Sequence, residues 1–328
     1  MTRRIPRRVL GAATSVLLGS ALIGMPVPAS AAGPCGILTY NPAQQPTYDH
    51  VIVIMDENFS YSAFQKPGVA PFLHSLAAAC GSETLMHAVT HPSQPNYMAA
   101  TSGMATGVGA QTANQNVFNQ LVLNGKSWRT YEESMPAPCS ATQYTVAPAY
   151  KSGHNPAFWY NDLRTPTNTC ALYDLAMSPA LDNDLAADNL PALAWVSPNL
   201  CHDMAWDASC GYAQSSKVAA GDTWLSTFIP RLTALPSFQS GHTLVIVTVD
   251  EGGGSNAKGV DCTAPSYYST HPDCQIPTIV LSAYIQPGTV DSADHNLYTL
   301  LGTAQDILGV ARLGKAQGAG SLRPGLGF

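Results

Sequence analysis

Four acidic side chains end two apolar runs of this sequence and could hold a metal ion. Asp56 and Glu57 follow the first run, VIVIM, and Asp250 and Glu251 follow the second, TLVIVTV. Residues that directly follow parallel strands lie together at the carboxyl edge of a sheet, where α/β proteins bind their ligands. Carboxylates gathered there repel one another unless positive charge lies among them. The two pairs therefore predict a divalent cation at this edge.

Ser93 is the residue that could react beside such a cation. It lies in the segment HPSQPNY (91–97), just before a run of small residues, 98–104, that can form a helix. By position alone, the commoner role of such a serine is to cap the helix. Beside a cation held by the acidic pairs and Asn58, its hydroxyl could instead bind the ion, lose its proton near neutral pH and act as a nucleophile.

Histidine and lysine side chains could assist if the substrate carries a phosphate. His154 follows Lys151 in a loop sequence, and His295 stands just ahead of the last expected helix. Taken alone, each histidine is more often an ordinary loop residue. Near a phosphate, these side chains would offset negative charge or protonate a leaving oxygen.

The elements that must position these residues follow an alternating order. The runs 51–55 and 243–249 show no polar alternation, which is typical of strands buried on both faces of a parallel sheet. Further strands are expected at 84–89, 127–131, 193–196 and 278–282. Helices are expected at 69–79, 117–123, 217–235, where Pro230 would kink or end the helix, and 297–308. The alternation predicts an α/β fold with a central, mostly parallel sheet flanked by helices.

Two regions depart from this alternation. The stretch 132–188 is rich in Pro, Asn, Ser and Thr, which predicts loops and short elements over one edge of the sheet. The glycines of 252–254 would let the backbone turn tightly beside the site.

The first 31 residues have the pattern of a secretory signal peptide. Four arginines precede an apolar stretch, 9–23, and small residues at 29–31 provide a cleavage site. The pattern predicts a secreted protein with one catalytic domain, 32–328, and leaves Sec and twin-arginine export open. No later segment approaches 18 uninterrupted apolar residues, so we expect no stable membrane insertion.

The charge balance argues against nucleic acid as a partner. The chain has 15 basic and 21 acidic side chains, and removal of the first 31 residues leaves 11 basic ones. An acidic protein has no net positive field to attract phosphate backbones.

Eight cysteines in the exported part predict disulfides. An even number in an oxidising compartment favours pairing over a zinc cluster, which would need short CxxC spacing. Eight cysteines allow 105 pairings, and sequence does not choose among them. The neighbours Cys201 with Cys210 and Cys262 with Cys274 would close small loops, which leaves Cys35 with Cys80 and Cys139 with Cys170 as a plausible remainder.

Eight segments of the chain together resemble a known family. In this order, they are similar to successive motifs of the phosphoesterase family, which contains bacterial and fungal acid phosphatases and phospholipases C within the alkaline phosphatase-like superfamily. The segments are MDENFSYSAF (55–64), HPSQPNYMAATSG (91–103), HNP (154–156), SPNLCHDM (197–204), GDTWL (221–225), VTVDEGGG (247–254), IPTIVLS (276–282) and DHNLYTLLGTAQDILG (294–309).

The resemblance implies roles for the candidate residues by position. The implied metal ligands are Glu57, Asn58, Ser93, Asp250 and Glu251. The implied catalytic residues are Ser93 as nucleophile with His154 and His295, and the implied substrate-binding residues are His91, Asn96, Lys151 and Asp203. Oxygen ligands favour Ca²⁺, Mg²⁺ or Mn²⁺, with Zn²⁺ or Fe as other possibilities.

These features lead to one main hypothesis and two alternatives. We expect a secreted, metal-dependent phosphoric ester hydrolase that forms a phosphoserine and acts on a small phosphate ester. No extra lipid-binding domain or basic amphipathic helix is evident, which favours a phosphomonoesterase over a phospholipase C with a phospholipid substrate. A secreted binding protein without catalysis is the alternative of another class. Sequence leaves the oligomeric state open.

Overall fold

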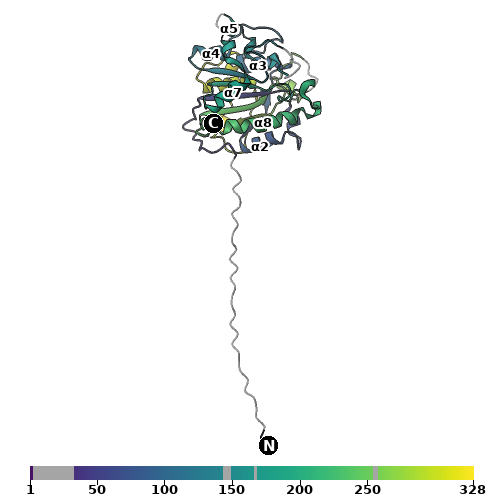
Figure 1. Cartoon of the computed structure of the whole chain (residues 1–328), viewed down its shortest axis with the longest axis vertical. Coiled ribbons are helices and arrows are strands. Elements are labelled where there is room, and N and C mark those ends of the chain that lie inside the picture. Colours follow the sequence, from purple (N-terminus) through teal and green to yellow (C-terminus); the bar gives the residue numbers. More distant parts are fainter. Residues whose placement is uncertain (3–32, 143–148, 166–167, 254–257) are drawn as a thin grey trace. The chain divides into compact units, whose positions relative to one another are not determined.

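An eight-stranded sheet forms the centre of the fold in a computed structural model, which describes residues 1–2, 33–142, 149–165, 168–253 and 258–328 (Figure 1). The expected signal peptide lies almost entirely outside these described residues. Across the sheet the strands run in the order β5 (Asp174–Ala176), β4 (Trp128–Glu132), β6 (Leu193–Ser197), β1 (His50–Asp56), β7 (Thr243–Val249), β8 (Thr278–Leu281), β2 (Gly81–Glu83) and β9 (Thr289–Asp291).

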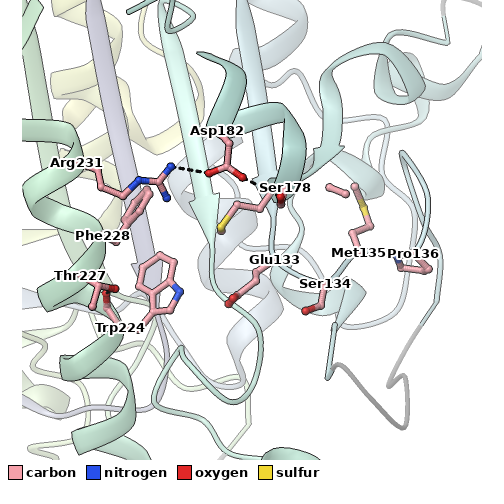
Figure 2. Close-up of a pocket in the computed structure, with 12 residues that line it drawn as sticks. Glu133, Ser134, Met135, Pro136, Ser178, Asp182, Trp224, Thr227, Phe228 and Arg231 are labelled. Atoms are coloured by element: carbon pink, nitrogen blue, oxygen red, sulfur yellow. Dashed lines mark hydrogen bonds and ion pairs between the residues drawn. The ribbon is translucent and has the colours of Figure 1, made fainter. Parts of the chain in front are cut away.

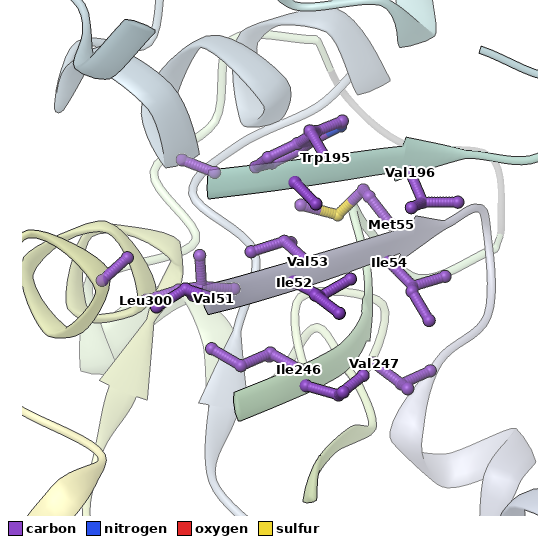
Figure 3. Packing of buried hydrophobic residues seen from close by; sticks show 14 of the residues in the cluster. Val51, Ile52, Val53, Ile54, Met55, Trp195, Val196, Ile246, Val247 and Leu300 are labelled. Atoms are coloured by element: carbon purple, nitrogen blue, oxygen red, sulfur yellow. The ribbon is translucent and has the colours of Figure 1, made fainter. Parts of the chain in front are cut away.

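The two apolar runs form the central pair of strands, β1 and β7. They pair in parallel over seven residues, from His50 opposite Thr243 to Asp56 opposite Val249. Figure 3 shows side chains of β1 on both faces, packed between β6 and β7 and against Leu300 of a covering helix. Because β-branched side chains suit a pleated surface and both faces are buried, these runs favour strands. Strand β8 alone runs antiparallel to its neighbours, so the expected mostly parallel α/β sheet is confirmed.

Helices cover both faces of the sheet, and two pairs of them contact each other. Figure 1 shows α2 (Pro71–Ala79) beside α8 (Lys217–Thr233), with α3 (Ser93–Ser102) and α4 (Val117–Leu123) on the other side of the sheet. Helix α11 (Leu297–Ile307) packs against α3. The buried carboxylate of Asp222 in α8 accepts from the backbone N–H groups of Phe72 and Leu73, each at 2.9 Å, and so caps α2.

One expectation for the elements is wrong. The sheet strand near 84–89 is β2, which ends at Glu83, while β3 (Met86–His87) pairs with β10 (His295–Asn296) in a separate two-stranded sheet. Gly81 fits β2 because Ile285 and Leu326 close over the space that a Cβ would need. A glycine-led strand of three residues has no apolar pattern that sequence could reveal.

The stretch 132–188 forms loops and mainly short elements at one edge of the sheet, as expected. It contributes β5, which extends the sheet, and helix α7 (Met177–Ala186), whose solvent face is polar. Only two side chains of α7 are buried, so its amphipathic signal is weak. Pro230 does not end α8, which continues to Thr233.

All eight cysteines form disulfides. The bonds join Cys35 to Cys80, Cys139 to Cys170, Cys201 to Cys210 and Cys262 to Cys274. These bonds are the two short-loop pairs named above and the two pairs that remain once those are formed. Among the described residues, no helix has the length and apolar character needed to cross a bilayer.

Candidate active site

Ser93 lies between two acidic residues that follow the central strands. It is the first residue of α3, and its Oγ donates to Oε2 of Glu57 at 2.9 Å and to Oε1 of Glu251 at 3.5 Å. Glu57 is fully buried, and Ser93 keeps an exposed fraction of 7%. The parallel pairing of β1 and β7 brings the two carboxylates to the same edge, as the sequence predicts.

Asn58 and Asp250 complete the group that we call the Glu57 cluster: Glu57, Asn58, Ser93, Asp250 and Glu251. Asn58 donates from its side chain to Oε2 of Glu57 at 2.6 Å and from its backbone to Oδ1 of Asp250 at 3.2 Å. Its φ of 49° lies in the left-handed region, which asparagine tolerates better than most residues. A Cβ at Gly253 would lie 2.6 Å from the carbonyl oxygen of Asn58, so glycine permits this close approach.

The carboxylates of the cluster differ in their electrostatics. Burial alone would raise the pKa of Glu57, but the charge and hydrogen bond of His154 and the charge of Lys151 lower it to about 2. Burial, then the charges of Glu57 and Glu251, raises the pKa of Asp250 well above its ordinary value. Oδ2 of Asp250 is buried without a hydrogen-bond partner among the described residues. This oxygen-rich, charge-crowded donor set fits a hard divalent cation.

His154 is held between two carboxylates. Its Nε2 lies 3.0 Å from Oε1 of Glu57 and its Nδ1 lies 3.1 Å from Oδ2 of Asp203. The ring stacks on Tyr97 with 5.4 Å between ring centroids. Burial disfavours the charged ring, but the charge of Glu57 and the hydrogen bond of Asp203 outweigh it and raise the pKa of His154. His154 is therefore oriented by two carboxylates that favour its charged form, and it shares the contact with Glu57 that Ser93 makes.

Three further basic side chains surround the cluster. Nδ1 of His91 lies 2.6 Å from Oε2 of Glu251. Lys151 is close enough for its charge to lower the pKa of Glu57. Nζ of Lys217, the first residue of α8, donates to the carbonyl oxygen of Asn58 at 3.3 Å. Sequence reasoning missed Lys217, because a lysine at the start of an amphipathic helix carries no local signal of a site.

Two expected site residues have other neighbours. Oδ1 of Asn96 accepts from the backbone N–H groups of Val89 and Thr90, and its Nδ2 donates to the carbonyl oxygen of Thr90. Asn96 is fully buried, and its amide holds the loop before Ser93. The ring of His295 contacts Asp291 and Glu83, and the described contacts do not join it to the Glu57 cluster.

A cavity of about 740 Å³ is lined by residues of α7, α8 and the segment after β4. Figure 2 shows Trp224 and Phe228 of α8 on one side of this cavity, with Asp182 of α7 paired to Arg231. The carboxylate of Glu133, which also lines it, lies 2.9 Å from Nδ1 of His202. Because no member of the Glu57 cluster lines this cavity, it is separate from the candidate active site.

Solved structures share the fold of this chain. A protein of the alkaline phosphatase superfamily from Vibrio parahaemolyticus has the same fold, with a TM-score of 0.56, 16% identity, and coverage of 88% of this chain and 74% of that one. A phosphonate monoester hydrolase of Agrobacterium radiobacter gives a TM-score of 0.52 at 13% identity, over 86% of this chain and 77% of that one. The fold is therefore that of the alkaline phosphatase superfamily.

The chain belongs to the phosphoesterase family, whose model matches residues 62–311. It is 29% identical to a phosphatidylinositol-3-phosphatase of Mycobacterium tuberculosis, over 84% of this chain and 81% of that protein. It is also 29% identical to an acid phosphatase of Aspergillus fumigatus, over 52% of this chain but only 38% of the fungal protein. The expected family and enzyme class are confirmed: this is a hydrolase of phosphoric esters.

Proposed function

We propose that the protein is a secreted, metal-dependent phosphomonoesterase that forms a phosphoserine at Ser93. One observation carries this proposal: the hydroxyl of Ser93 lies at the start of α3, within 3.5 Å of carboxylate oxygens from both central strands. Helix α3 has no side-chain cap at its N-terminus, so the backbone N–H groups of Ser93 and Gln94 could bind phosphate oxygens there, whereas Pro95 has no N–H.

The reaction divides into two displacements at phosphorus. Oγ of Ser93 attacks the phosphorus in line, the bond to the ester oxygen breaks, and the alcohol leaves after it gains a proton. Water then attacks the phosphoserine and releases inorganic phosphate, which restores the hydroxyl. A divalent cation held by the Glu57 cluster would lower the pKa of the Ser93 hydroxyl and offset charge on the phosphoryl group.

The basic side chains supply the remaining positive charge. His154 points Nε2 at Glu57 and keeps this orientation through Asp203. His91 is held by Glu251, and Lys151 acts on the same carboxylates through its charge. A transferring phosphoryl group has little covalent chemistry for the protein to perform, so such fixed charges account for most of the catalysis.

The named relatives favour a monoester over a diester substrate. Both are named as phosphatases, one for a phosphoinositide and one without a stated substrate. A phospholipase C would instead cleave the bond between the glycerol oxygen and phosphorus of a phospholipid. It must therefore accept a phosphodiester at Ser93. Four disulfides support export, because such bonds persist in oxidising compartments.

A substrate panel and a trapping experiment test the proposal. We expect hydrolysis of p-nitrophenyl phosphate, with much slower hydrolysis of p-nitrophenyl phosphorylcholine and phosphatidylcholine. Acid quenching during turnover should leave a phosphate on Ser93 that mass spectrometry detects. Activity on diesters alone would instead identify a phospholipase C, and no turnover of any ester would favour a binding protein.

A matched pair of variants tests the nucleophile. Ser93→Ala should lower kcat by at least about 10⁴-fold, since the attacking atom is lost. Ser102→Ala is the control, because Ser102 is buried in the same helix and its hydroxyl bonds to the backbone of Met98 and Met104, outside the Glu57 cluster. Turnover by Ser93→Ala at the rate of the control would refute the assigned nucleophile.

A further inference from the structure

A second cluster of metal-binding side chains lies outside the candidate active site. We call it the Glu83 cluster: Glu83 at the end of β2, Asp291 at the end of β9 and His295 in β10. One ligand atom from each lies within 4.8 Å of the others. Nε2 of His295 is 3.2 Å from Oδ2 of Asp291 and 4.0 Å from Oε2 of Glu83. Ligands that share one cation have separations in this range.

The two carboxylates of the cluster face each other by strand register. Glu83 pairs with Asp291 in the parallel ladder of β2 and β9, and like charges directly opposite on neighbouring strands destabilise a sheet. The pair therefore needs either a bound proton or a cation at neutral pH.

Glu83 has no partner that would explain its burial. Its side chain is fully buried, and neither oxygen accepts a hydrogen bond from the described residues. A buried carboxyl without partners costs several kcal/mol unless something satisfies it. The unpartnered side chain lies next to the ring of His295, where a cation would meet all three ligands.

The chain closes tightly over this cluster. A Cβ at Gly325 would lie 1.8 Å from Oδ2 of Asp291, and one at Gly320 would lie 3.4 Å from the ring of His295. The C-terminal segment therefore packs closely against Asp291 and His295. Two other groups of potential ligands among the described residues include cysteines already paired in disulfides, so they cannot hold a metal in the same way.

We propose that Glu83, Asp291 and His295 form a second metal site, for a divalent transition-metal ion such as Zn²⁺ or Mn²⁺. Two carboxylates with one imidazole suit these ions, whereas Ca²⁺ and Mg²⁺ prefer oxygen ligands alone. The site is separate from the Glu57 cluster, because β2 lies two strands from β7, about 10 Å across the sheet. Its role is to join β2, β9 and β10, which otherwise pair over only two or three residues.

Metal counting and thermal unfolding test this site with Zn²⁺ and, separately, Mn²⁺ as probes. The purified protein is stripped with a chelator, reloaded and dialysed, and its metal content is measured. Glu83→Gln and Asp291→Asn keep the side-chain shapes and should each bind one ion fewer per chain than the unaltered protein. At a cation concentration 100-fold above its Kd, this site should add about 5 °C to the Tm of the unaltered protein, and both variants should lose this part of the gain.

Two further variants separate the possible outcomes. Glu132→Gln replaces a buried carboxylate in β4 that has no histidine neighbour, and it should keep both the metal content and the Tm gain. Asp250→Asn should lose only the ion of the Glu57 cluster. Its metal content therefore shows whether that site binds an ion, independently of the Glu83 cluster. Equal metal content and equal Tm gain in the unaltered protein and in Glu83→Gln would overturn the second site and leave a protonated Glu83 as the explanation.

Discussion

Replacement of Asp203 by asparagine tests whether His154 acts as a fixed positive charge. Oδ2 of Asp203 lies 3.1 Å from Nδ1 of His154, and both residues are buried. Asparagine keeps the shape and can still accept from the backbone N–H of Ala205, as Oδ1 does now at 2.8 Å. The change therefore removes one charge and little packing.

The size of the effect follows from the distance. Opposite unit charges 3.1 Å apart attract by about 5 kcal/mol at an effective dielectric constant of about 20. Desolvation of the buried carboxylate cancels roughly half of this, which leaves about 2.7 kcal/mol of support for the charged ring. At about 1.4 kcal/mol per factor of ten, kcat should fall about 100-fold in Asp203→Asn.

Steady-state kinetics on p-nitrophenyl phosphate measure this effect across pH 4 to 8. We expect kcat to fall while KM changes less than about threefold. Because loss of Asp203 lowers the pKa of His154, activity should also be lost at a lower pH on the alkaline side. Glu133→Gln removes the carboxylate of a similar pair with His202, outside the Glu57 cluster, and should change kcat less than threefold. Equal losses in both variants, or full activity of Asp203→Asn, would show that the charge on His154 does not matter.

Two further changes probe packing and titration. Gly252→Ala would place a Cβ against the carbonyl oxygen of Asp273. About 2 kcal/mol of overpacking should then lower Tm by about 5 °C and lower activity. Gly107→Ala is the control, because a Cβ there meets open space and should change neither quantity. Burial raises the pKa of Asp174 from 3.8 to about 6, so the folded state binds this proton more tightly and stability contributed by Asp174 falls by about 2 kcal/mol as pH rises from 4 to 6. Denaturant titrations at both pH values should show this loss in the unaltered protein and not in Asp174→Asn; an identical pH dependence in both would contradict it.

The sequence determined the central part of the fold and the chemistry of its edge. The runs 51–55 and 243–249 could only be buried strands, because continuous β-branched and apolar side chains need cover on both faces. The residues that directly follow such strands must then share one edge, so the sequence alone predicts that Glu57 and Asp250 lie together. Strand formation and the position of the residues after each strand depend on neighbouring residues in the chain, so the sequence pattern predicts both.

The tertiary structure decided which distant side chains meet. Strand order placed β2 and β9 together, which brought His295 to Glu83 although its sequence position next to a helix resembles that of a catalytic residue. The crossing of α8 over the sheet brought Lys217 to Asn58, 159 residues earlier in the chain. The loop before α3 took up the amide of Asn96 for its own backbone. No local pattern encodes these contacts, because they depend on how the elements cross and pack, and that is fixed only when the whole core assembles.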